Sequence, residues 1–368
     1  MESTIATRST RRASTAFEQY ASGCRALVAG VVFFLESAEH LAPLLEITTR
    51  GDFVIVPSSA SGRAMAAATA RGVSAIRYDG RWVAAGDELV LDGHHRYELQ
   101  DYLSVPFISI VGPTVVRQRS ARGIASFFRD ADAARYSGAF VDQLLSSAVT
   151  IESASSFLHP SADEGAVVRV HVSAEGELRD GPDGALFGRL GDARDDIVAT
   201  AASRSGRGRA FERIVDGPDV DAAAEARPWL GRYLAAIELL RRWDGPVGTT
   251  AISGFGGHLV RALDDGEEAP SIVAASAPFL VAGHGDEYIL VDPSSRHRFR
   301  VERDAARAAE CLIATGDERA AAALLAADDG RSARGAARVV RGIRGRLLEA
   351  GVDLTAFRPG TGERPAST

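Results

Sequence analysis

The sequence contains no lysine and no asparagine, so all 42 of its basic residues are arginine. A phosphate-binding Walker loop needs a lysine at a fixed position, and this class of nucleotide site is therefore excluded. Cysteine is scarce as well, since only Cys24 and Cys311 are present and they stand far apart. Two isolated thiols indicate neither a disulfide framework nor a thiolate metal site, and this usage fits a reducing cytoplasm.

Long apolar runs are also missing. The segment that comes nearest to a membrane span is ALVAGVVFFL over residues 26–35, and it is too short to cross a bilayer. It follows Arg11 and Arg12, as the apolar part of an export signal would, but Glu18 intervenes and no small-residue cleavage site comes after it. The run therefore predicts a buried strand, and we expect a cytoplasmic protein with no membrane partner.

The overall composition is that of a globular chain. Its 368 residues suit two or three domains, and 46% of them are hydrophobic while 25% are charged. The net charge of -7 argues against nonspecific affinity for DNA, although a local basic face could still bind it. DNA is therefore not the partner that we expect.

The chain predicts a multidomain fold of the α/β and α+β classes. Residues 1–22 are polar and predict a flexible tail. Residues 23–148 alternate apolar runs with helical patterns, which is typical of an α/β domain with a sheet covered on both faces. Residues 149–265 predict a region of β-hairpins and helix, residues 270–357 a third domain, and residues 358–368 a second flexible tail.

The middle region gives two local predictions. Apolar residues alternate at Val168, Val170 and Val172 and are followed by Gly and Pro-Asp-Gly turns, which predicts β-hairpins. Further on, apolar residues recur at helical spacing after Pro228 and predict an amphipathic helix. These residues are Leu230, Leu234, Ile237 and Leu240.

No segment nominates a catalytic residue. ISGFGGHLVRAL, residues 252–263, has the strand, glycine and helix order of a phosphate-binding turn but lacks the full glycine spacing, so it favours close backbone packing or a hinge. His94 and His95 are adjacent and would point to opposite faces of a strand, so they predict no metal site. We expect a non-catalytic protein without cofactor or metal.

The third region predicts three short strands followed by three helices. The strands are APFLVAG, EYILVD and RHRFRVE, and Arg296, Arg298 and Arg300 alternate along the last of them. Gly316 is expected to end the first helix, Asp317 to cap the second, which buries Leu324 and Leu325, and Gly351 to end the third. The apolar face of the third helix would hold Ala336, Val339, Val340, Ile343 and Leu347. Glycines 335, 342 and 345 should each weaken it by about 1 kcal/mol relative to alanine.

This order of elements resembles the winged helix-turn-helix recognition domain of pathways for ribosomally synthesised and modified peptides (RiPPs), the PqqD-like family. The resemblance covers about residues 274–354 and rests on DAARAAECLIATGDERAAAALLA leading to VVRGIRGRLLEAGVDL. The third helix departs from the family pattern in its length and glycines, and the run before it is longer. The preceding segments VRVHVSAEGELRDGPDGALFGRLGD and TTAISGFGGHLVRAL look like those of daptide-type recognition proteins.

The resemblance implies a protein that binds the leader of a precursor peptide and presents it to separate enzymes. In daptide-type pathways these enzymes are an oxidative decarboxylase, an aminotransferase and a methyltransferase. The leader would add as a strand beside the third strand and against the third helix, while other regions would dock the enzymes or form a homodimer. The residues implied in peptide binding are Arg296, His297, Arg298, Phe299, Arg300, Val301, Val340, Arg344 and Leu348.

Local charge agrees with an acidic leader. Residues 296–346 hold twelve arginines and seven acidic residues, a difference of +5 in a chain of net charge -7. An ordinary solvated face explains Arg334, Arg338 and Arg341 equally well, because they lie opposite the apolar face of their helix. Two other functions stay open, a winged-helix transcriptional regulator with a ligand-sensing N-terminal domain and an enzyme that uses the N-terminal α/β domain.

Overall fold

The computed structural model describes residues 2–25, 28–158, 166–204, 206–243, 250–264, 271–283 and 287–357, with side chains from residue 12 onward. The chain divides into two compact units, residues 1–128 with 142–227 (unit 1) and residues 129–141 with 228–368 (unit 2). The predicted breaks near residues 148 and 265 are wrong, because strands on both sides of residue 148 belong to one sheet. The predicted tail at 358–368 lies outside the described residues.

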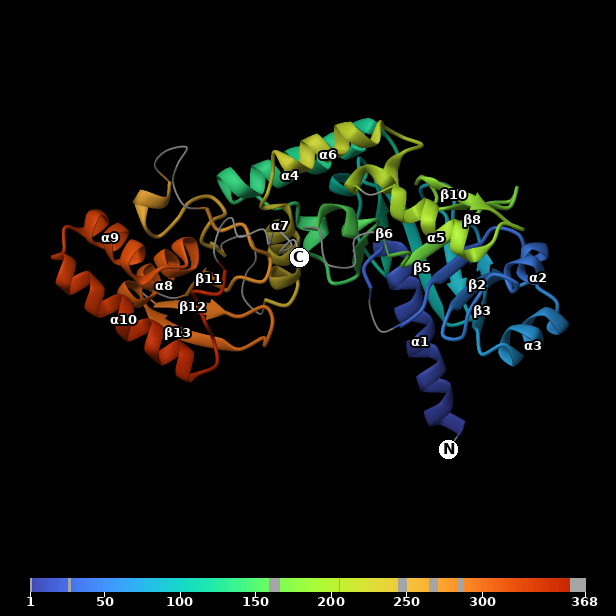
Figure 1. Cartoon of the computed structure of the whole chain (residues 1–368), viewed down its shortest axis with the longest axis horizontal. Helices are drawn as coiled ribbons and strands as arrows, with labels where there is room; N and C mark the ends of the chain where they lie inside the picture. Colours follow the sequence, from blue (N-terminus) through green and yellow to red (C-terminus); the bar gives the residue numbers. More distant parts are fainter. Residues whose placement is uncertain are drawn as a thin grey trace, which may run out of the picture. The chain divides into compact units, whose positions relative to one another are not determined.

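Unit 1 is built on a ten-stranded mixed sheet, which confirms the α/β class (Figure 1). The strand order is β10-β9-β8-β1-β2-β3-β4-β5-β6-β7. The strands are β1 Val32–Leu35, β2 Phe53–Pro57, β3 Ser74–Gly80, β4 Glu88–Leu91, β5 His95–Asp101, β6 Thr114–Arg117, β7 Val149–Ile151, β8 Arg169–Val172, β9 Glu177–Arg179 and β10 Leu186–Arg189. β8 pairs antiparallel with β9, and β9 pairs antiparallel with β10, so the predicted hairpins are confirmed. β8 also pairs in parallel with β1, and all four of its residues are buried, so it is an inner strand of the sheet.

The helices of unit 1 connect and cover these strands. They are α1 Glu2–Ser22, α2 Leu41–Leu44, α3 Gly62–Ala70, α5 Arg194–Ser203 and α6 Gly217–Glu225. Helix α4, Ala121–Ser137, begins in unit 1 and ends in unit 2. Single 3₁₀ turns occur at Ala38–His40, Val105–Phe107, Asp142–Leu145, Ala154–Phe157 and Arg207–Phe211 in unit 1 and at Arg261–Leu263 in unit 2. Across the ranges that the structure describes, no helix is long and apolar enough to cross a bilayer.

The predicted tail over residues 1–22 is wrong, because residues 2–22 form α1. Five of its side chains, all buried, recur at helical spacing and face the sheet. They are Ala13, Ala16, Phe17, Tyr20 and Ala21, which share one core with residues of β1 to β6. From residue 12 onward this helix thus has a buried face, which its polar composition did not indicate.

The sheet curls around the end of α1, and Arg169 fixes that end. β7 and β8 are distant in the strand order, yet the Arg169 guanidinium of β8 donates to Ser153 Oγ, just after β7, at 2.8 Å. The same group donates to the carbonyl oxygens of Tyr20 and Ala21 at 3.0 Å each. It therefore satisfies the last carbonyls of α1, which have no partner within the helix.

A buried carboxylate balances this arginine. Asp180 accepts from Arg169 Nε at 2.9 Å and from Arg209 Nε at 2.6 Å. Burial by itself would raise the pKa of Asp180, but the two guanidinium groups outweigh burial and hold this pKa below its usual value. Charged groups buried without such partners would be costly, and here each has one.

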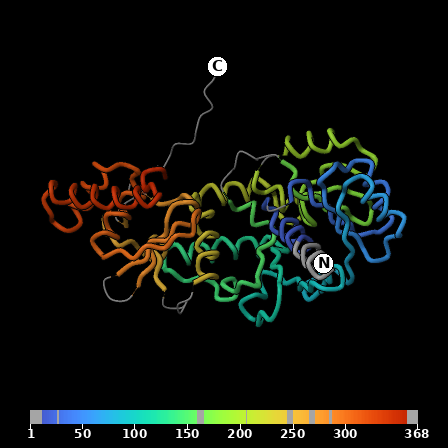
Figure 2. Tube along the Cα trace, turned by 90° about the horizontal axis from the view of Figure 1, so that it is seen from below, coloured from blue at the N-terminus to red at the C-terminus, as the bar shows by residue number. Residues whose placement is uncertain are grey.

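Unit 2 contains three antiparallel strands followed by three helices, in the predicted order. Its elements are α7 Leu230–Leu240, β11 Phe279–Ala282, β12 Glu287–Val291, β13 Arg298–Glu302, α8 Arg303–Thr315, α9 Glu318–Asp329 and α10 Ala333–Glu349. The amphipathic helix predicted after Pro228 is α7, and its four apolar residues are buried. Figure 2 shows α8 to α10 layered on the small sheet.

The predicted helix ends in unit 2 are confirmed. Gly316 follows α8 in the left-handed conformation, with φ of 62°, and Asp317 accepts from the N–H groups of Arg319 and Ala320 at 3.0 and 2.9 Å. Gly351, with φ of 84°, follows α10. Leu325 is buried as predicted, whereas Leu324 is only partly buried.

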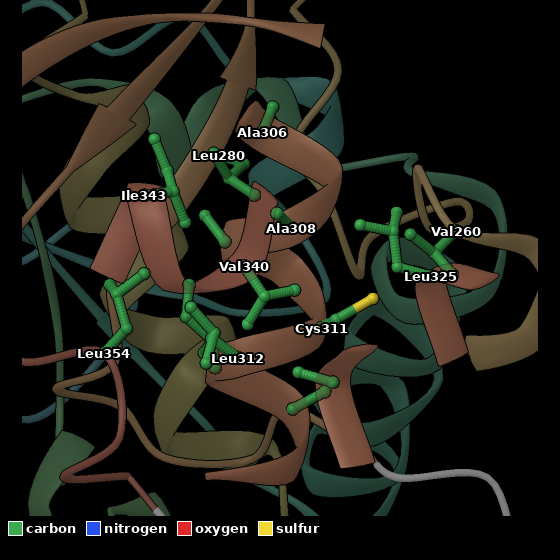
Figure 3. Packing of buried hydrophobic residues seen from close by; sticks show 14 of the residues in the cluster. Val260, Leu280, Ala306, Ala308, Cys311, Leu312, Leu325, Val340, Ile343 and Leu354 are labelled. Carbon is green, nitrogen blue, oxygen red and sulfur yellow. The ribbon is translucent and has the colours of Figure 1, made fainter. Parts of the chain in front are cut away.

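The core of unit 2 joins all three helices to the sheet. Figure 3 shows Val340 and Ile343 of α10 close to Leu312 of α8, with Cys311 nearby. Burial raises the pKa of the Cys311 thiol to about 12, so this thiol stays protonated and acts as a small apolar side chain. Phe299 and Val301 of β13 pack on the same cluster, which ties the last strand to the helices.

Glu310 of α8 holds the glycine-rich segment that precedes β11. This fully buried carboxylate accepts from Ser253 Oγ, from His258 Nδ1 at 3.0 Å, and from the N–H groups of Leu259 and Val260 at 3.1 and 2.8 Å. The glycines here serve close packing, because a Cβ on Gly256 would lie 2.8 Å from a backbone nitrogen. The prediction of close backbone packing is confirmed.

Replacing Phe17 by alanine should destabilise unit 1 by about 3–5 kcal/mol, because the ring is fully buried between α1 and the sheet. Denaturant unfolding followed by the fluorescence of Trp82, which packs on Phe17, measures this loss. Arg12→Ala, an exposed position of the same helix, is the control and should change stability by less than about 0.5 kcal/mol. Equal effects of the two variants would contradict the buried position of α1.

Candidate peptide-binding edge

A tight turn sets the start of β13. Asp292 accepts from the N–H groups of Ser294 and Ser295 at 3.0 and 3.2 Å, and its own N–H donates to His297 O at 3.0 Å. Arg296 lies in this turn with φ of 62°, which a non-glycine residue rarely adopts. The prediction that Arg296 begins the strand is therefore wrong, since β13 starts at Arg298.

The pairing of β13 with β12 determines which backbone groups point outward. In an antiparallel pair, hydrogen-bonded and non-hydrogen-bonded residue pairs alternate. Because Asp292 bonds with His297, the register places the backbone groups of Phe299 and Val301 toward β12. Those of Arg298 and Arg300 point to the outer side of β13, and their side chains lie on the face away from the core.

The two edges of the small sheet differ. On the β11 side, Ala282 N–H donates to Ala251 O at 2.9 Å and Ser253 N–H donates to Leu280 O at 2.8 Å, so the chain itself covers that edge. β13 is the last strand on the opposite side, and among the described strands it pairs with β12 alone (Figure 1). The edge that the sequence nominated is thus the outer edge of this sheet.

Charge is unevenly distributed along β13. The guanidinium of Arg298 lies 5.3 Å from the centre of the Trp243 ring and donates to Arg242 O at 3.1 Å. Arg300 is exposed and, within the described part of the chain, makes no side-chain ion pair. At the far end Glu302 stands opposite Glu287 of β12. The edge is therefore basic at the start of the strand and acidic at its end.

Apolar and aromatic groups lie next to these charges. Phe299 and Val301 are partly buried on the core side, and the His297 ring meets the Phe299 ring edge to face at 6.1 Å. His297 itself is exposed. A chain laid beside β13 would thus meet apolar groups on one face and arginines on the other.

The residues nominated on α10 are placed differently from the prediction. Val340 is only 1% exposed and belongs to the core, so it cannot contact a peptide. Arg344 donates to Glu318 of α9 at 2.5 Å. Its positive charge is therefore paired with a carboxylate of unit 2. Leu348 is 49% exposed and remains accessible. The structure therefore narrows the candidate site to β13 and Leu348.

Searches of family models, curated proteins and solved structures found no match to this chain.

Unit 1 brings together polar residues that the sequence did not nominate. Tyr20 Oη lies 2.8 Å from His171 Nδ1, and His171 Nε2 lies 3.1 Å from Glu36 Oε1 at the carboxyl end of β1. The hydrogen bond from His171 lowers the pKa of Glu36, and burial raises the pKa of Tyr20. Glu36 also accepts from Ala174 N–H at 2.8 Å. It therefore links the carboxyl ends of β1 and β8, the place where ligands bind in many α/β folds.

The contact of Arg298 with Trp243 should contribute about 0.5–1 kcal/mol to the stability of unit 2, because the arginine is exposed to solvent. A double-mutant cycle with Arg298→Ala and Trp243→Ala measures it through the free energy of unfolding. Independent effects that simply add would show that the ring does not hold this arginine. The same cycle made with Arg300→Ala should give no coupling.

Proposed function

We propose that this protein recognises an extended peptide by strand addition at β13, and that the peptide is the leader of a RiPP precursor. Three strands followed by three helices on one core support a winged helix-turn-helix arrangement for unit 2. The observation that carries the proposal is the outward direction of the Arg298 and Arg300 backbone groups on the last strand of the sheet. An incoming strand can form a ladder of hydrogen bonds with backbone groups that point outward from such an edge.

The edge is suited to a specific peptide more than to another copy of itself. β13 has only five residues, and in an antiparallel pair of two copies Arg300 would stand opposite Arg300 and repel it. An acidic peptide removes this repulsion, and each charge-assisted hydrogen bond to an arginine there would contribute about 1.5–3 kcal/mol. Selection thus comes from charge, and main-chain pairing provides the general affinity.

The charge gradient along β13 also orients the peptide. Arg298 and Arg300 attract acidic residues at the start of the strand, while Glu302 and Glu287 repel them at its end. The bound segment should therefore carry its acidic residues beside Arg298 and Arg300. The protein would act as a non-catalytic partner that hands the precursor to daptide-type modifying enzymes.

The precursor peptide encoded beside the gene should bind the full chain with micromolar or tighter affinity, about -8 kcal/mol or better. Arg300→Pro should weaken this binding at least tenfold, because proline removes an outward N–H that the peptide needs. The fold should tolerate this change, since proline is accepted at outward positions of edge strands. Isothermal titration and thermal unfolding together make the measurement.

Two further variants separate the possible causes. Arg300→Ala removes the charge and keeps the N–H, so it should weaken binding less than Arg300→Pro. Val301→Pro removes an N–H that faces β12 and should destabilise unit 2 by about 3 kcal/mol. If Arg300→Pro binds the precursor as tightly as the unmodified chain, strand addition at this edge is disproved.

A further inference from the structure

The exposed face of α10 carries charge that strand addition does not use. The helix holds five arginines and a single acidic residue, Glu349, at its end. Its core side is formed by Ala336, Val340, Ile343 and Leu347. Helical spacing places another set of residues on the opposite side, which we name the arginine-glycine face. This face consists of Arg334, Arg338, Arg341, Gly342 and Gly345.

The residues of this face weaken the helix that carries them. Arg334 lies in the first turn, where the positive end of the helix dipole disfavours a cation, and no acidic residue is present in that turn. Gly342 and Gly345 lower helix stability relative to alanine, although a Cβ at either position would meet no atom within 4 Å. Packing inside unit 2 therefore does not explain these glycines.

Neighbouring arginines form ion pairs within unit 2, whereas most of the arginines on this face do not. Arg307 pairs with Asp328 and with Asp329, and Arg331 pairs with Asp329 at 2.7 Å. In contrast, Arg334 and Arg338 form no ion pair within the described residues. Arg341 reaches Glu318 only at 4.0 Å and its side chain is 76% exposed. The positive charge is thus directed to solvent.

We propose that the arginine-glycine face docks an acidic α-helix of a partner protein. The three arginines match carboxylates at i, i+4 and i+7 of such a helix. The two glycines allow its backbone to approach α10 closely, and the face from Arg334 to Gly345 is about 17 Å long, which suits three turns.

Two other occupants fit less well. A second α10 would set arginines against arginines, and like charges at close range repel. A DNA duplex is longer than this face and would extend over other parts of unit 2, which holds 21 acidic residues and 20 arginines and so has no overall excess of positive charge. A short acidic helix confined to α10 meets the arginines of this face, and salt screens it from charges beyond about 8 Å.

The test uses the full chain and three fluorescent probes. They are a stapled helical peptide with glutamates at i, i+4 and i+7, the same peptide with glutamines, and a 20-base-pair DNA duplex. Fluorescence anisotropy should show binding of the glutamate peptide at least tenfold tighter than of either other probe. The triple variant Arg334→Gln, Arg338→Gln, Arg341→Gln should lose at least tenfold, whereas Arg63→Gln with Arg319→Gln, both exposed elsewhere, should not.

The glycines give a second readout that separates docking from a plain solvated face. Gly342→Ala with Gly345→Ala should raise the thermal midpoint of unit 2 by about 2–8 °C, since nothing obstructs the added methyl groups. On a docking face the same variant should bind the glutamate peptide at least fivefold more weakly. Unchanged binding by this stabilised variant, tighter binding of DNA, or no binding of the glutamate peptide would each overturn the proposal.

Discussion

The end of a β-sheet leaves every second backbone N–H and C=O of its last strand without a partner in the sheet, and this constraint organises both units. In unit 1 the chain just after the edge strand β7 bonds to the end of α1, because Ser153 N–H donates to Ala21 O at 2.9 Å, and Ser153 Oγ accepts from Arg169 of the inner strand β8. In unit 2 the chain covers β11 with its own segment, which the buried Glu310 holds in place. The outer side of β13 receives no such cover from the described strands, and this difference makes it a functional candidate.

Arginine provides every fixed cation in this protein, and its planar group with five donors explains how so many can be buried. Arg117 meets both oxygens of Glu152 at 2.6 and 2.9 Å in the interior of unit 1. Arg232 of α7 donates to three backbone carbonyls and stacks 4.0 Å from the Phe279 ring centre. An ammonium group carries its donors on one atom, so it would match neither the two parallel bonds to Glu152 nor the planar stacking on Phe279, and the absence of lysine shapes the interior as well as the surface.

Local patterns predicted local structure well. The three strands, the three helices of unit 2 and the ends at Gly316 and Asp317 follow from periodicity and capping, which act within a few residues. Helix α1 could have been recognised from its buried residues at i, i+3, i+4, i+7 and i+8, but its polar composition outweighed this signal. Composition is a poor guide where one face of a helix is buried and the other is solvated.

Long-range pairing accounts for most of what was missed. β8 joins β1 across more than a hundred residues, so no local pattern could show that the region after residue 148 completes the first sheet. In the candidate site, Arg296 lies in the turn at Asp292 and not in the strand, and Arg344 forms an ion pair with Glu318 on α9. Sequence placed the apolar and charged residues on the right elements but could not assign partners that come from another element.

The capping of α1 by Arg169 has a consequence for biosynthesis. Arg169 follows Tyr20 by 149 residues, and the other polar partner of Tyr20, His171, is similarly late. At about 5–20 residues per second, a ribosome needs roughly 7–30 s to deliver them after the helix has been made. β1 to β6, which cover the apolar side of α1, are made before Arg169, so during that interval the helix can pack on its sheet while its last carbonyl oxygens still lack their cap.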